Sequence, residues 1–165
     1  EQAGMGIAIG DCDTDGSLDV LKTHFAEDTA ALYRNMGHLN FEDVTLRSGL
    51  GVETRYVSWG NGIADLDNDG LPDLFWVTGS TFPEVERKHP EFPNKSPRIL
   101  FRNLGGGKFE ELLDAGPAIA EPRASRGVAG AASPLRLRAR RSRLTRVGRS
   151  TPTRRTSSSS SSTRS

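Results

Sequence analysis

The strongest constraint on the fold of this chain is an aspartate-rich pattern that occurs twice. The sequence DCDTDGSLD occupies residues 11–19, and DLDNDGLPD occupies residues 65–73. Both copies place four aspartates around one glycine at the same offsets. A pattern repeated this closely predicts that the chain is built from internal repeats.

The spacing of the aspartates predicts a calcium site in each copy. A hard divalent cation takes about six to eight oxygen ligands, and alternate residues of a tight loop can turn their side chains toward one centre. The residue between the glycine and the last aspartate would contribute its backbone carbonyl, and each glycine would allow a sharp bend with positive φ. The predicted Ca²⁺ ligands are Asp11, Asp13, Asp15, Ser17 and Asp19 in the first loop, and Asp65, Asp67, Asp69, Leu71 and Asp73 in the second.

Two other interpretations of the loops are open. Short Asp and Asn side chains can bond their own backbone and form a polar turn that needs no metal. The repetition of four aspartates at fixed offsets favours the metal site over such a turn. An EF-hand is disfavoured, because it needs a glutamate at the twelfth loop position, where this chain has Lys22 and Trp76.

A second pattern recurs downstream of each loop. LYRNMGHLNFEDV at residues 32–44 matches LFRNLGGGKFEEL at residues 100–112. The two loops start 54 residues apart and the two RN segments start 68 apart, so the second unit holds 14 extra residues. These residues fall in a polar, proline-containing stretch, which predicts an inserted surface loop at about residues 82–97.

Each unit contains four short β-branched and aromatic runs separated by Gly, Asn and Asp, which predict strands. No stretch is long and apolar enough to predict a membrane span. Four strands per repeat are typical of a propeller blade, with the aspartate loop joining the first two strands. The expected strands are 5–10, 18–25, 31–35 and 41–46 in the first unit and 56–64, 71–78, 98–103 and 108–113 in the second.

The DxDxDGxxD loops and the RNxGxxxFEDVTxxSGL stretch at residues 34–50 resemble FG-GAP/VCBS repeats, especially those of the ASPIC/UnbV-type, cartilage-acidic-protein-like family. The resemblance covers about residues 1–130. It implies a calcium-stabilised β-propeller of secreted or cell-surface proteins that serves adhesion or ligand binding. It also implies metal ligation by the loop residues named above. The FG and GAP dipeptides of the family are only loosely present.

We therefore expect an all-β fold, a partial β-propeller of about two blades followed by a disordered tail. The first blade spans residues 1–52, the second spans 53–122, and the tail spans 123–165. A third unit is expected to begin near Gly127, with an aspartate near residue 132, but the chain has alanine there. Because the repeat stops in this way and the chain opens in mid-repeat, we expect a fragment.

The charge of the chain changes at the same place. Residues 1–122 hold all 21 acidic residues against 10 basic ones, whereas residues 123–165 hold 12 arginines and no acid. We favour an out-of-frame translation as the origin of the tail, over a disordered linker and over an arginine-rich tether for nucleic acid, which is the least favoured. Nucleic acid is therefore an unlikely partner.

The sequence predicts a binding scaffold and not an enzyme. None of the histidines belongs to a catalytic motif, and carboxylates that hold Ca²⁺ are poor general acids. Cys12 is read as an incidental loop residue, and Trp59 and Trp76 as blade core. The expected function is a calcium-binding, extracellular or cell-surface scaffold for a protein or glycan partner. The alternative is the scaffold part of a larger extracellular polysaccharide-active enzyme.

Overall fold

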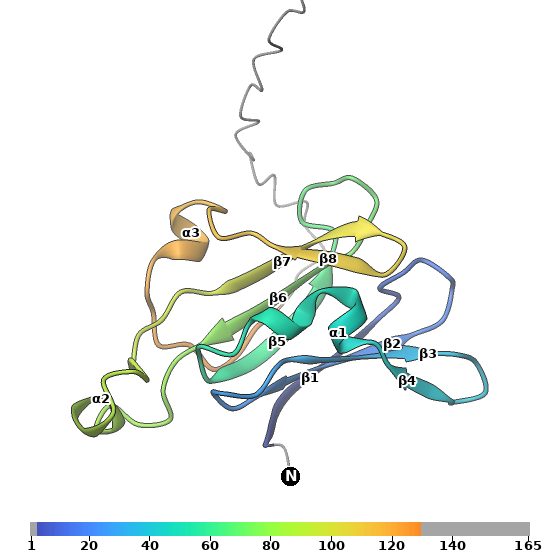
Figure 1. Ribbon diagram of the computed structural model, residues 1–165. Helices are drawn as coiled ribbons and strands as arrows, with labels where there is room; N and C mark the ends of the chain where they lie inside the picture. Colours follow the sequence, from blue (N-terminus) through green and yellow to red (C-terminus); the bar gives the residue numbers. More distant parts are fainter. Residues whose placement is uncertain (1–2, 130–165) are drawn as a thin grey trace, which may run out of the picture.

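A computed structural model describes residues 3–129, which form two four-stranded antiparallel sheets with strands in sequence order (Figure 1). The first sheet contains β1 (Gly4–Gly10), β2 (Asp19–His24), β3 (Ala31–Asn35) and β4 (Phe41–Asp43). The second contains β5 (Ser58–Ala64), β6 (Asp73–Thr78), β7 (Ile99–Gly105) and β8 (Lys108–Glu111). The described residues also form four short helical turns: α1 (Thr45–Ser48), η1 (Leu50–Val52), α2 (Val85–Lys88) and α3 (Pro117–Ala120).

All eight predicted strands are present, and their ends differ from the expected ones by at most three residues. The largest difference is at β4, because Thr45 leaves the sheet to begin α1. The backbone N–H of Thr45 donates to the Asp43 carboxylate at 3.0 Å, and its hydroxyl accepts from the N–H of Leu32. Helical turns of three or four residues leave no periodicity in a sequence, and they were not predicted.

The two sheets pack face to face around one shared hydrophobic core. The first sheet contributes the cross-strand neighbours Leu21 and Leu32. The second contributes Leu74, Trp76 and Phe101, and the rings of Trp76 and Phe101 stack with centroids 5.2 Å apart. Burial of these large side chains is the main source of stability for the pair of sheets. The prediction that Trp76 lies in the core is confirmed.

The sheets contact each other through faces that are not equivalent in the repeat. Leu21 corresponds by loop spacing to Phe75, which lies outside the shared core, and not to Leu74 or Trp76. Leu32 likewise corresponds to Leu100, which also lies outside it. The front of one sheet therefore packs on the back of the next, which is a head-to-tail arrangement that further copies can extend.

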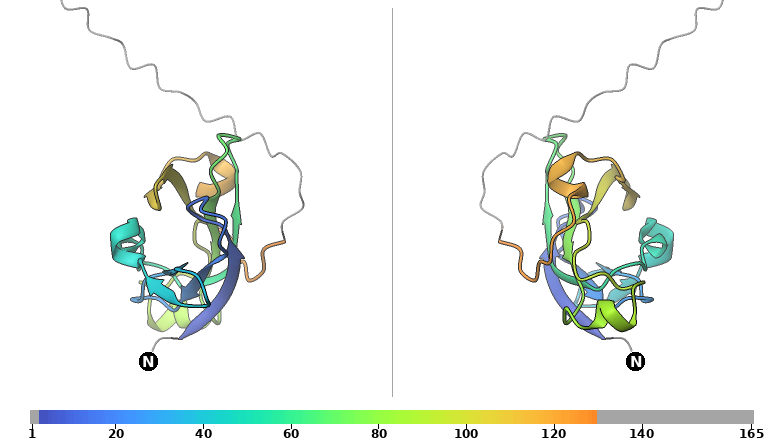
Figure 2. Two further views of the ribbon diagram at one scale, coloured as in Figure 1. Left: turned by 90° about the vertical axis from the view of Figure 1, so that its right-hand side faces the viewer. Right: turned by 90° about the vertical axis from the view of Figure 1, so that its left-hand side faces the viewer.

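The chain beyond the second sheet repeats the same contact. A Cβ on Gly6 would clash with the carbonyl oxygen of Trp59, and one on Gly60 would lie 2.9 Å from that of Arg126. Trp59 and Arg126 each immediately precede a glycine of the next unit, Gly60 or Gly127. Residues 126–128 therefore lie against β5 as Trp59 of β5 lies against β1, at the position where the spacing predicts a third unit. Figure 2 shows this segment in orange beside the sheets.

The disorder predicted from residue 123 onward is wrong for residues 123–129. Arg123 forms an antiparallel bridge with Ser96, and the N–H of Ser125 donates to the carbonyl of Thr78 at 3.2 Å. These backbone bonds join the segment to the end of β6 and to the inserted loop. The rest of the predicted tail, with the out-of-frame interpretation, lies outside the described residues.

Candidate metal centres in the two aspartate loops

Both aspartate loops join the first two strands of their sheet and lie at the same end of the molecule, on the right in Figure 1. In the first loop the Asp11 carboxylate accepts from the N–H groups of Asp15 at 3.1 Å and Gly16 at 3.0 Å. Asp65 accepts from Asp69 and Gly70 at 3.2 and 3.0 Å in the second. The two loops thus have the same internal conformation, with the predicted positive φ at Gly16 (89°) and Gly70 (90°).

The fourth aspartate of each loop is buried and forms part of the loop's frame. Asp19 accepts from the N–H of Cys12 and Asp73 from that of Leu66, at 2.9 and 3.1 Å. Burial raises the pKa of both carboxyls, and their hydrogen bonds with backbone N–H groups only partly offset it. Neighbouring loop aspartates add repulsion in the same direction, which a bound cation would relieve.

The asparagine of each RN segment closes the loop, a role that the sequence analysis missed. The N–H of Asn35 donates to Asp19 and that of Asn103 donates to Asp73, both at 2.9 Å. The side-chain amide of Asn103 also donates to the carbonyls of Pro72 and Cys12, both at 2.8 Å. The bond to Cys12 joins the second sheet to the first loop. The recurrence of Arg-Asn at one repeat position was the signal that could have identified this role.

Three carboxylates converge in each loop. Oxygens of Asp11, Asp13 and Asp15 lie within 4.8 Å of one another, as do those of Asp65, Asp67 and Asp73. Two oxygens bound to one Ca²⁺ are at most about 5 Å apart, because each Ca–O distance is about 2.3–2.6 Å. The donor set is entirely oxygen, so each cluster fits a hard cation and could hold a metal ion.

The structure brings together only some of the predicted ligands. Asp19 and Asp69 lie outside the two convergent groups. Ser17 and Leu71 donate their N–H groups to Asp15 and Asp69 at 2.8 and 2.9 Å. Metal ligation by the ten predicted residues, including the carbonyls of Ser17 and Leu71, stays a prediction.

A cationic side chain distinguishes the first loop from the second. The Nε of Arg34 lies 2.5 Å from the Asp13 carboxylate, and its Nη2 lies 3.0 Å from that of Asp15. The N–H of Ser17 and then Arg34 lower the pKa of the Asp15 carboxyl. Arg102 has the same repeat position, but it pairs with Glu110 at 3.1 Å, outside the second loop.

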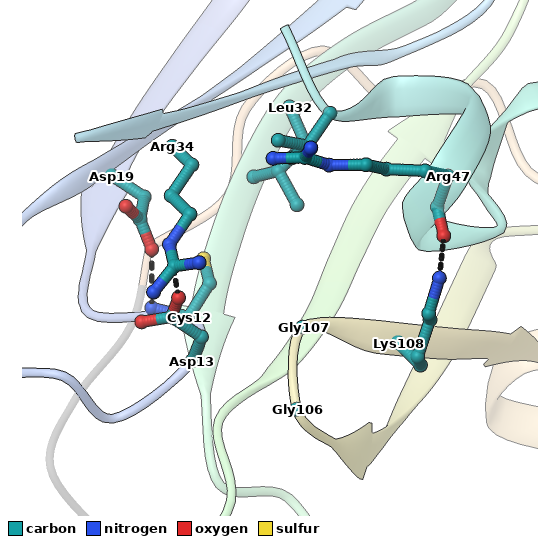
Figure 3. Close-up of a pocket in the computed structure, with 10 residues that line it drawn as sticks. Cys12, Asp13, Asp19, Leu32, Arg34, Arg47, Gly106, Gly107 and Lys108 are labelled. Carbon is teal, nitrogen blue, oxygen red and sulfur yellow. Dashed lines mark hydrogen bonds and ion pairs between the residues drawn. The ribbon is translucent and has the colours of Figure 1, made fainter. Parts of the chain in front are cut away.

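A cavity of about 260 Å³ opens between the first loop and the β7–β8 turn (Figure 3). Asp13 and Arg34 line it from the first sheet, and Lys108 lines it from the second. Cys12 also borders it, but its side chain is 1% exposed and belongs to the shared core. Burial, followed by the nearby aspartates, raises the pKa of the Cys12 thiol to about 12. The Cys12 thiol therefore packs in the shared core. The sequence had suggested only that Cys12 is an incidental residue of the loop.

Trp59 differs from its predicted place in the blade core. Its ring is only half-buried, and the Arg126 guanidinium lies 4.4 Å from the ring centroid. The indole N–H donates to the carbonyl of Gly79 at 2.8 Å. Segment 126–128 covers this ring because it packs on β5, a contact that the local pattern around Trp59 does not reveal.

Comparison with known proteins supports the predicted resemblance of the chain to FG-GAP/VCBS repeats. The family model of an FG-GAP-like repeat matches residues 11–76, which run from the first aspartate loop through the second and into β6. No curated protein matches the chain. Within residues 3–129, none of the helices has the length and apolar character that crossing a membrane requires.

Proposed function

We propose that this chain is a calcium-binding β-propeller segment of a secreted or cell-surface protein, in which the two sheets are consecutive blades. The observation that carries the proposal is the identical frame of the two loops, each with three convergent carboxylates. The head-to-tail packing of the sheets, continued by residues 126–128, supports the propeller. The FG-GAP-like match supports an extracellular setting. From the resemblance of residues 34–50, we further propose that the chain belongs to the ASPIC/UnbV-type branch of these repeats.

In this proposal the metal has a structural role, and the protein is not an enzyme. Ca²⁺ would neutralise carboxylates that otherwise repel one another, and it would stabilise the folded state because the site forms only on folding. The loops would then present a rigid end of the molecule to a protein or glycan partner in adhesion or ligand binding. The aspartates, held by backbone N–H groups, position the cation.

Calorimetric titration of the full chain with CaCl₂ tests the proposal. We expect two binding events, loss of one in Asp13→Ala, loss of the other in Asp67→Ala and loss of both in the double variant. The melting temperature should rise with Ca²⁺ and fall in EGTA, because ligand bound only to the folded state adds stability. Arg87→Ala, in α2 of the inserted loop, is the control and should leave both events unchanged. No heat of binding and an unchanged melting temperature in EGTA would contradict the proposal.

A further inference from the structure

The two aspartate loops share one backbone hydrogen-bond pattern, but an arginine contacts the carboxylates of only the first loop. Arg34 and Arg102 occupy one repeat position, each at the register point of the third strand that faces a glutamate on the fourth. Arg102 pairs with its cross-strand glutamate, Glu110. Arg34 instead turns into the first loop and pairs with Asp13 and Asp15, as Figure 3 shows for Asp13.

The cross-strand glutamate of the first sheet has a different partner. Glu42 faces Arg34 in the β3–β4 register, but its carboxylate accepts from Arg47 at 2.6 Å. Arg47 and Glu42 are both more than 40% exposed, so water readily replaces this pair. Glu42 is therefore available as a second acceptor for Arg34, in the arrangement that the other sheet already shows.

From this difference we propose that Arg34 is a built-in competitor for the cation of the first loop. Resting on the proposed calcium function, the inference is that Ca²⁺ binding displaces the Arg34 guanidinium from Asp13 and Asp15 and transfers it to Glu42. The second loop has no such competitor among the described residues, because Arg102 is held by Glu110. The two loops therefore bind Ca²⁺ with unequal affinity, and the second fills first.

The geometry supports direct competition. Asp13 and Asp15 both belong to the convergent group of the first loop, and the guanidinium engages one oxygen of each. The Asp13 side chain is 8% exposed, so solvent screens its pair with Arg34 less than it screens a surface pair. Two partly exposed ion pairs of this kind correspond to about three- to tenfold in binding affinity.

The test is a calorimetric Ca²⁺ titration of the full chain in two backgrounds. In the Asp67→Ala background only the first loop is expected to bind Ca²⁺, so its affinity is measured alone. In the Asp13→Ala background only the second loop is expected to bind. In the first background, Arg34→Gln should tighten Ca²⁺ binding by about three- to tenfold. The matched control is Arg102→Gln in the second background, which removes the same charge at the same repeat position without releasing a loop carboxylate. We expect it to change the affinity by less than about twofold, the weakest effect of an exposed charge.

Glu42→Gln tests the transfer itself. With Arg34 present, the loss of its second acceptor should weaken Ca²⁺ binding to the first loop, and with Arg34→Gln it should have no effect. This coupling is the signature of a shared partner, which a general loss of structure would not produce. Arg34→Lys, which keeps the charge but cannot engage both carboxylates in the same way, should give a smaller gain and guards against misfolding of Arg34→Gln.

The outcomes separate the inference from the function on which it rests. Two sites of equal affinity, or an Arg34→Gln chain that binds Ca²⁺ as the parent does, would overturn the competition and leave the calcium function intact. Equal effects of Arg34→Gln and Arg102→Gln would assign the difference to overall charge and overturn it too. No Ca²⁺ binding in either background would overturn both.

Discussion

Replacing Asn103 with alanine should show how strongly the second sheet holds the first aspartate loop. The Asn103 side chain is 2% exposed, and it donates to the carbonyls of Cys12 and Pro72 while accepting from the N–H of Gly105 at 2.9 Å. A net hydrogen bond contributes about 1 kcal/mol, and a buried group left without a partner costs about 1–3 kcal/mol. We expect Asn103→Ala to lower the free energy of unfolding by about 3 kcal/mol.

Asn35 provides the matched control at the same repeat position. Its side chain donates only to the carbonyl of Leu18, at 3.2 Å, and accepts from the N–H of Gly37 at 2.9 Å. Asn35 is only half-buried, so water can replace part of the hydrogen bonding that the substitution removes. Asn35→Ala should therefore cost about 1 kcal/mol. The difference of about 2 kcal/mol measures the additional bond to Cys12 and the deeper burial.

Urea unfolding in EGTA, followed by tryptophan fluorescence, measures both free energies without a contribution from bound metal. The comparison requires that the unfolding free energy fall with urea concentration at the same slope in the parent and the variants. Equal losses for the two variants, or a larger loss for Asn35→Ala, would refute the view that Asn103 ties the two sheets together.

Two further predictions concern groups away from the loops. His24 is 1% exposed, and burial, with the nearby positive Lys22, lowers the pKa of its imidazole. The unfolded chain then binds a proton below about pH 6.5 that the folded chain does not, so stability should fall with decreasing pH below that value. Melting temperatures between pH 5 and 7.5 should show this slope in the parent and a smaller one in His24→Gln; identical slopes would contradict it. Gly60→Ala should cost about 1–3 kcal/mol, because its Cβ would lie 2.8 Å from the backbone nitrogen of Val128. In Gly62→Ala the nearest contact is 3.7 Å away, so it should change the melting temperature little, and equal effects of the two would count against the packing of residues 126–128 on β5.

The parts of the fold that local chemistry controls could be predicted from the sequence. The loops have the expected positive φ at Gly16 and Gly70, because only a residue without Cβ adopts it at no cost. The eight strands follow from β-branched and aromatic runs between turn residues. The packing of residues 126–128 on β5 follows from the repeat spacing, since equivalent positions in a repeat make equivalent contacts.

The sequence by itself thus determined the repeat, the strands and the conformation of each aspartate loop, since these depend on residues a few positions apart. Only the tertiary structure decided which of two equivalent arginines enters a loop, because Arg34 and Arg102 have similar local sequences, LYRNMG and LFRNLG, and differ in their surroundings. It also decided that Asn103 reaches Cys12, 91 residues away, and that Arg126 covers Trp59. Such contacts arise when one sheet is stacked on the next, and the head-to-tail stacking makes equivalent side chains face different neighbours.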